Sequence, residues 1–170
     1  ATAFAAGVSA ELHASVRDGV LEALVPRAGA PGLEAILAAR LPLGALRTFP
    51  SLASHLPAGL PRGPLELTVD APHLDSCALA TLLPAGTPLV PVVAGLGGFA
   101  TFDLSEPLGG SAEIAIREMT AETGAGPLAL ARPARVVLRE GRVSVEELAV
   151  EGLRTSFTAS ASAEVLPSGL

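Results

Sequence analysis

The chain has 170 residues, a formal net charge of −6 and 49% hydrophobic residues, yet only 3% of its residues are aromatic. All 11 basic residues are Arg, and they form no basic stripe with interleaved aromatics, which disfavours a nucleic-acid partner. The single cysteine, Cys77, excludes an internal disulfide. The sequence does not open with a charged n-region followed by an apolar stretch, and it has no apolar run long enough to span a bilayer, so we expect neither a signal peptide nor a membrane span within these residues. The alternating pattern is under way near Ala1 and the only methionine is Met119, so we expect a piece of a longer protein.

Alternation of apolar and polar residues predicts strands in the first part of the chain. Residues 8–16 alternate throughout, and Asp18-Gly19 predicts a hairpin turn into a return strand over residues 20–25. Pro26 is expected to end that strand, with residues 27–32 as a Pro/Gly-rich loop.

The next segment mixes strand and helix signals. Residues 33–40 fit either a strand or an Ala-rich helix, and the neighbouring strands favour a strand. Between residues 43 and 56, leucines and Phe49 recur at helical spacing, with Pro50 interrupting. This pattern predicts two short helical turns packed over one end of the sheet, followed by a Pro/Gly linker over residues 58–64.

Alternation resumes in residues 65–69, and Asp75 is a candidate N-cap for a short helix from residue 76 to residue 83. Residues 84–91 are expected to form a loop. Glycines at positions 95, 97 and 98 weaken the first half of the next strand pattern, so the strand is expected over residues 99–104.

The second half predicts short antiparallel strands. Glu140-Gly141 is a two-residue hairpin signal. Glu146-Glu147 shifts the alternation so that Leu148 and Val150 continue the inward face, which predicts a β-bulge. The strands expected here are residues 111–119, 128–131, 134–139, 142–150 and 154–165.

The last of these strands, RTSFTASASAEV, alternates most regularly. Its twelve residues would span roughly 40 Å, whereas about five or six residues are usual in a strand. We interpret it as one wall of an elongated apolar trough for acyl chains, because its inward residues are small. The residues expected to line this groove are Ile114, Ile116, Val143, Val145, Phe157, Ala159, Ala161, Ala163 and Val165.

The fold class predicted is therefore all-β with one or two short helices, built from mostly antiparallel strands that each have one apolar face. Residues 33–56 and 65–84 repeat an outline of extended stretch, short helix and Pro/Gly break, which suggests sub-units 1–63 and 64–170.

The sequence contains only weak candidates for metal-binding or catalytic motifs. His73, Asp75 and Cys77 alternate in HLDSC, but a zinc site needs three or four ligands and only distant histidines remain. We favour an Asp helix cap beside a buried small thiol. No dinucleotide fingerprint, nucleophile elbow or carboxylate pair is found, so no catalytic residue, metal or cofactor is expected.

Five arginines near predicted strand ends allow two interpretations. They could form a positive rim that touches lipid headgroups, or a plain solvated face, and the second is favoured. These residues are Arg132, Arg135, Arg139, Arg142 and Arg154.

A family resemblance rests on three passages: DAPHLDSCALATLLP, GGSAEIAIREM, and PLALARPARVVLREGRVSVEELAVEGLRTSFTASASAEV. They resemble the periplasmic repeats of the TamB family of translocation and assembly module proteins and, more loosely, AsmA-like proteins. The resemblance covers residues 33–165 and is best over residues 137–165, where some glycines of the family pattern are missing near Thr155 and Ala161.

The resemblance implies an elongated, U-shaped, mostly antiparallel open sheet with an apolar interior, called a β-groove. It implies that residues 1–170 are a single fragment of a repeating β-groove domain in the periplasmic portion of an inner-membrane-anchored envelope protein of a Gram-negative bacterium. It implies a role in lipid transfer and outer-membrane biogenesis, with phospholipid acyl chains as ligands. An outer-membrane assembly barrel could be a partner through regions outside this sequence. The family brings no catalytic residues.

Two hypotheses follow. In the first, the chain is a lipid-conduit segment in which the apolar face shields acyl chains. In the second, it is a non-catalytic structural or protein-binding β-module, whose apolar face is closed by helices or which docks partner strands.

Overall fold

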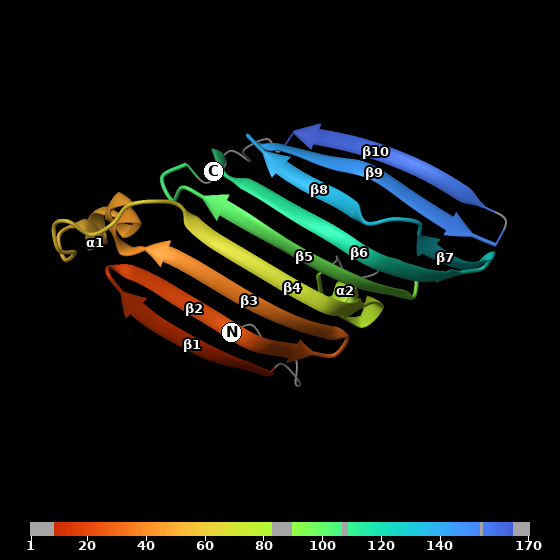
Figure 1. Ribbon diagram of the computed structural model, residues 1–170, viewed down its shortest axis with the longest axis horizontal. Coiled ribbons are helices and arrows are strands. Elements are labelled where there is room, and N and C mark those ends of the chain that lie inside the picture. The colour runs from red at the N-terminus through yellow and green to blue at the C-terminus, as the bar shows by residue number, and fades with distance from the viewer. Residues whose placement is uncertain (1–8, 83–89, 107–108, 154, 165–170) are drawn as a thin grey trace.

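The computed structural model describes residues 9–82, 90–106, 109–153 and 155–164. In these residues ten strands form a single sheet, and every hydrogen-bonded pair of strands is antiparallel (Figure 1). The all-β prediction is confirmed. The strands are β1 (Ser9–Arg17), β2 (Val20–Ala30), β3 (Leu33–Pro42), β4 (Leu65–Asp75), β5 (Val92–Phe102), β6 (Ser111–Thr123), β7 (Gly126–Leu130), β8 (Ala134–Arg139), β9 (Arg142–Gly152) and β10 (Ser156–Glu164).

The strands follow one another across the sheet in chain order, from β1 at one edge to β10 at the other. The short strands β7 and β8 share one place in this order, because each pairs with β6 on one side and β9 on the other. The predicted boundary between sub-units, at residues 63 and 64, lies between β3 and β4. These two strands pair with each other as neighbouring strands do elsewhere in the sheet. The described chain is thus one continuous, open sheet.

The prediction that Pro26 ends its strand is wrong. β2 runs through Pro26 to Ala30, and the β2–β3 register shifts between Val25 and Ala28. A bulge leaves an extra residue unpaired, so the missing N–H of a proline there need not break the ladder. The actual turn lies at Pro31-Gly32, where Gly32 has φ 77°.

The expectation that β5 starts only at residue 99 is also wrong, because the strand covers Val92–Phe102, and residues 103 and 104 lie beyond it. Its glycines make room for neighbours instead of interrupting the strand. A Cβ on Gly98 would collide with the Glu113 carbonyl oxygen, and one on Gly97 with the Arg117 guanidinium. Close approach of another group is a common reason for glycine within a strand.

The short helices agree with the sequence. The 3-10 helix η1 (Leu43–Thr48) and helix α1 (Pro50–Ala53) follow β3, as the helical spacing predicted. Helix α2 (Ser76–Leu82) follows β4, and the Cys77 N–H donates to Asp75 Oδ1 at 2.7 Å, which confirms the predicted cap. The end of that predicted helix at residue 83 and most of the loop 84–91 lie outside the described residues.

The C-terminal strands match their predicted order closely. The bulge at Glu146-Glu147 is confirmed: Ala159 lies opposite Leu148 and Ala161 opposite Val145, so two residues of β9 face one of β10. Glu147 has φ 40°. β10 is shorter than predicted, since Thr155 lies before the strand and positions 154 and 165 lie outside the described residues.

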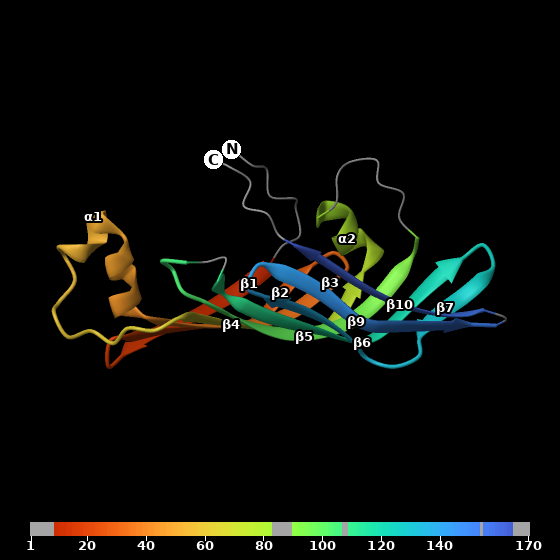
Figure 2. The same ribbon diagram turned by 90° about the horizontal axis from the view of Figure 1, so that it is seen from above.

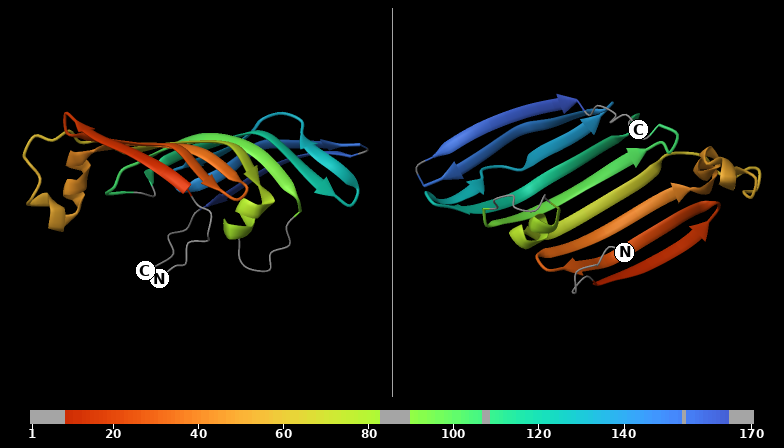
Figure 3. Two further views of the ribbon diagram at one scale, coloured as in Figure 1. Left: turned by 90° about the horizontal axis from the view of Figure 1, so that it is seen from below. Right: turned by 180° about the vertical axis from the view of Figure 1, so that it is seen from behind.

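The helices stand on one side of the sheet (Figures 2 and 3). η1 and α1 lie beyond one end of the strands, and α2 lies at the other end. This follows because η1 and α1 come after β3, α2 comes after β4, and these two strands run in opposite directions. Among the described residues, no helix combines the length and apolar character needed to cross a membrane.

Candidate functional site

One face of the sheet carries an apolar row that crosses the strands without a polar residue. Directly paired residues in antiparallel strands point to the same face, so the strand registers trace the row from one strand to the next. It runs through Ala14, Ala23, Ala39, Leu67, Ala100, Ala112, Leu138, Val143 and Ala163.

A second row lies two residues away from the first along the strands from β2 to β10, and it belongs to the same face. It is also free of polar side chains. It runs through Val25, Leu37, Val69, Gly98, Ile114, Val136, Val145 and Ala161. We call the face that bears both rows the apolar face.

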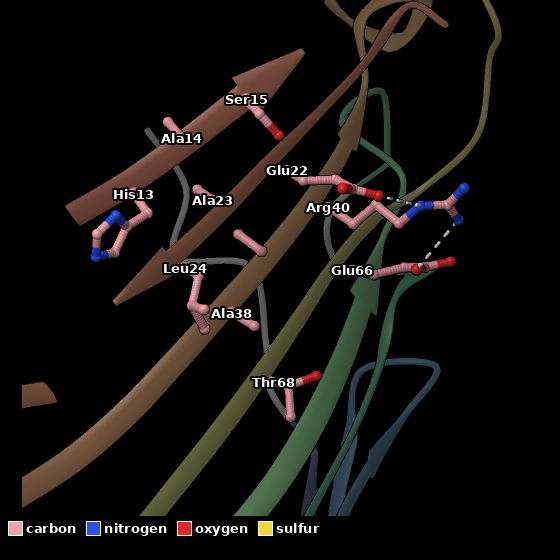
Figure 4. Close-up of a pocket in the computed structure, with 11 residues that line it drawn as sticks. His13, Ala14, Ser15, Glu22, Ala23, Leu24, Ala38, Arg40, Glu66 and Thr68 are labelled. Carbon is pink, nitrogen blue, oxygen red and sulfur yellow. Dashed lines mark ion pairs between the residues drawn. The ribbon is translucent and has the colours of Figure 1, made fainter. Parts of the chain in front are cut away.

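The opposite face, which we call the polar face, carries the intervening residues. One of its rows runs through Ser15, Glu22, Arg40, Glu66, Thr101, Ser111, Arg139, Arg142 and Glu164. Arg40 lies between Glu22 and Glu66, with N–O distances of 4.0 and 3.6 Å (Figure 4). This face therefore carries charged and hydroxyl side chains that the two apolar rows lack, although its neighbouring row also includes Leu24 and Phe99.

Three of the five arginines considered as a headgroup rim form ion pairs with carboxylates. Arg135 pairs with Glu113 at 3.1 Å, Arg142 with Glu164 at 2.9 Å, and Arg132 with Glu147. Both Arg135 and Arg142 belong to the polar face, away from the apolar rows. This arrangement fits the solvated-face interpretation, and position 154 lies outside the described residues.

The eight described residues of the predicted groove all lie on the apolar face. Ile114, Val143, Val145, Ala161 and Ala163 belong to the two rows above. The other three share the face through their partners or by alternation: Ile116 pairs with Ala134, Phe157 with Val150, and Ala159 with Leu148. Ile114 is 39% exposed and Phe157 47% exposed, so the face is open to solvent there. The ninth predicted residue, Val165, lies outside the described residues.

A hollow on the apolar face lies over β2 to β6, and the sequence did not indicate it. It has a volume of about 450 Å³. Alternation in β2, β3 and β4 was visible in the sequence, but nothing there showed that these strands are neighbours of β6. Its apolar-face lining consists of Ala23, Val25, Leu37, Ala39, Leu67, Val69, Gly98, Ala100, Ala112 and Ile114.

Helix α2 covers only one corner of the apolar face. Three alanines of the sheet, Ala35, Ala71 and Ala94, continue the alternation of the apolar rows and are at most 8% exposed. Ala78 of α2 is also buried. Figure 3 shows α2 against the sheet near β4. We infer that α2 packs over these alanines, and that the hollow over β2 to β6 lies beside it.

The described residues offer no metal centre, since no cluster of three His, Cys, Asp or Glu side chains occurs among them. His73 Nε2 lies 3.9 Å from Asp75 Oδ2, and Asp75 is occupied as the cap of α2. The expectation of a buried thiol is wrong: Cys77 is exposed, because the helix turns the neighbouring Ala78 inward instead.

Comparison with known proteins finds no matching family model, no matching curated protein and no matching solved structure. The resemblance to the TamB family stays a prediction from the sequence.

Proposed function

We propose that this chain is a segment of an envelope lipid-transfer conduit, in which the apolar face shields phospholipid acyl chains. The observation that carries the proposal is the pair of uninterrupted apolar rows, of which the first extends from β1 to β10 and the second from β2 to β10. The face that bears them is exposed at residues such as Leu67 and Phe157. Exposed apolar patches of this extent mark interaction surfaces. The proposed role is non-catalytic and needs no metal or cofactor.

The energetics favour an acyl chain as the ligand. Burial of a methylene contributes about 0.8 kcal/mol, so a chain of about 15 methylenes gains on the order of 12 kcal/mol before binding costs. Ala23, Ala39 and Ala100 are small, which leaves a hollow of about 450 Å³ above them. Larger side chains would be expected if protein atoms filled this space.

The placement of the helices also supports a lipid ligand over a closed β-module. Within the described residues, α2 covers the corner near Ala71, whereas η1 and α1 stand beyond the strand ends (Figure 2). By its resemblance to TamB repeats, the proposed conduit would belong to the periplasmic portion of an inner-membrane-anchored protein, where it would support outer-membrane biogenesis and protein assembly.

The alternative function, docking of a partner strand, is favoured by the β10 edge. All nine residues of β10 are exposed, and Glu164 is its only charged residue, whereas β1 at the other edge carries Glu11 and Arg17. Natural edge strands are commonly protected by charges, proline or bulges. In this alternative, Ser160→Pro would abolish partner binding and leave lipid capture unchanged.

Native mass spectrometry of the full chain after purification from a bacterial envelope tests the proposed function. We expect co-purified phospholipid, which is lost in Leu67→Asp and kept in Ser162→Asp, an exposed residue opposite Ser144 on the polar face. Far-UV circular dichroism checks that both variants retain the sheet. A folded wild-type chain without lipid, or equal lipid loss in both variants, would contradict the proposal.

A further inference from the structure

A polar pocket of about 380 Å³ lies at the strand ends near η1. We call it the strand-end pocket. Its wall comes from three segments far apart in the chain: η1, the approach to β4, and the residues after β5. The residues that line it are Gly44, Ala45, Arg47, Thr48, Arg62, Gly63, Asp103 and Ser105.

The strand-end pocket adjoins the end of the apolar face. Leu65, the first residue of β4, pairs with Phe102, the last residue of β5. Leu65 lies two residues before Leu67, and Phe102 lies two residues after its partner Ala100, so both belong to the apolar face. Arg62 precedes this pair in the chain, and Asp103 follows it. Figure 2 shows η1 and α1 on the same side of the sheet as α2, which is the side of the apolar face. A ligand could therefore occupy both regions.

The two arginines of the strand-end pocket lack acidic partners. Neither Arg47 nor Arg62 forms an ion pair with a carboxylate of the described residues. Arg47 Nη2 donates to the carbonyl oxygens of Leu56 at 2.9 Å and Pro57 at 2.8 Å, which fixes its guanidinium. Its Nε is buried with no hydrogen-bond partner, and it is the only such side-chain atom in the described part of the chain.

The single carboxylate in the pocket is already engaged. Asp103 Oδ1 accepts the Ser105 hydroxyl at 2.5 Å and the Ser105 N–H at 2.8 Å. These two bonds lower the pKa of Asp103, so the carboxylate stays ionised at neutral pH. Two guanidinium groups against one carboxylate leave the pocket lining with an excess of one positive charge.

We propose that the strand-end pocket binds a phosphate group, with Arg62 as its principal contact and the fixed Arg47 guanidinium as a second positive charge. Arginine suits this role because its planar guanidinium donates two parallel hydrogen bonds to phosphate oxygens. The phosphate could belong to a lipid headgroup or be free in solution. The lipid source rests on the proposed function, because it requires the acyl chains to lie on the adjoining apolar face.

The test uses NMR of the full chain titrated separately with inorganic phosphate, with dihexanoyl phosphatidate and with an uncharged alkyl maltoside of matched chain length. We expect phosphatidate to shift the amides of Thr48, Gly63 and Ser105 together with methyl groups of the apolar face. Arg62→Gln should weaken phosphatidate binding roughly fivefold to tenfold, since it removes a charged hydrogen-bond donor. Arg139→Gln is the matched control, because Arg139 also lacks an ion pair among the described residues and lies on the polar face.

Each outcome decides the proposal. Shifts at the pocket with both phosphate and phosphatidate support a phosphate site that accepts either source, and shifts with phosphatidate alone support a lipid headgroup site. Binding of the maltoside to the apolar face, without any phosphate effect at the pocket, overturns the phosphate site but leaves the lipid conduit standing. Absence of binding by all three ligands contradicts both. An equal loss in Arg139→Gln would show non-specific charge attraction and overturn the phosphate site.

Discussion

Ala161 of β10 lies directly opposite Val145 of β9, and Val145 lies opposite Val136 of β8. This alignment exists only because the bulge at Glu146-Glu147 absorbs an extra residue of β9. Without the bulge, the part of β10 beyond it would slip by one position and turn its alanines to the polar face. The bulge therefore extends the apolar face to the last strand of the sheet.

The first prediction concerns the reach of the apolar face. Ala161→Glu places a carboxylate beside Val145 and should weaken binding of a fluorescent fatty acid at least fivefold, because burial of an unpaired charge is costly. Ser162→Glu, one residue along and opposite Ser144 on the polar face, should leave the affinity unchanged. Both sites are exposed, so neither variant should lose more than about 1 kcal/mol of folding stability. Equal affinities of the two variants would confine the binding surface to the strands before β10.

The second prediction concerns Gly98, which lines the hollow. Gly98→Ala should destabilise the chain by roughly 1–3 kcal/mol in urea unfolding, because the new Cβ meets the Glu113 carbonyl oxygen and the Ile114 backbone. Gly124→Ala is the control: a Cβ at that position would meet no atom within 4 Å, and the substitution should change stability by less than about 0.5 kcal/mol. A Gly98 variant as stable as the Gly124 variant would show that β5 and β6 are not packed as closely as described.

The third prediction concerns the hairpin between β8 and β9. Glu140 and Gly141 both have positive φ, 50° and 71°, as a type I′ turn requires. Asn tolerates this conformation better than Glu, so Glu140→Asn should stabilise the chain by roughly 0.5–1 kcal/mol and raise its melting temperature. Glu118→Asn, within β6, should give no stabilisation because strands disfavour Asn. A lower melting temperature for the Glu140 variant would argue against this turn.

The fourth prediction concerns the pH dependence of Asp103. The Ser105 hydroxyl, followed by the Ser105 N–H, lowers the pKa of Asp103 below its ordinary value of 3.8. A lowered folded-state pKa means that its stabilising contribution is complete above pH 3.8 and is lost as the pH falls through the folded value. NMR titration of the Asp103 carboxyl carbon should show this low midpoint, and Ser105→Ala should raise it. Ser111→Ala, whose hydroxyl bonds Thr101 instead, should not. An unmoved midpoint in Ser105→Ala would refute the assigned cause.

The strand pattern could largely be predicted because one-faced strands impose a period of two on the sequence. β8 was predicted to the residue, and the bulge at Glu146-Glu147 was visible as a change of phase. The predictions at Pro26 and Gly98 were wrong for a shared reason, because both residue types usually end or weaken a strand. Pro26 is tolerated at a bulge, and Gly98 is tolerated where a neighbouring strand approaches closely.

The sites were harder to predict than the strands. The groove residues of β6, β9 and β10 were placed on one face correctly, since alternation alone determines the face. The hollow at Leu67 and the strand-end pocket at Arg62 were missed. Both depend on which strands are neighbours and on where η1 lies, and local sequence patterns do not determine such long-range arrangements.

The fifth prediction concerns binding of acyl chains to the apolar face. Methyl-labelled chain is mixed with stearic acid that carries a nitroxide near its methyl end, and methyl signal loss is measured. We expect broadening of Leu67, Val69 and Ile114, which line the hollow, while Leu24, which lies on the polar face of β2, stays sharp. Equal broadening of Leu24 and Leu67, or none at either, would contradict the account.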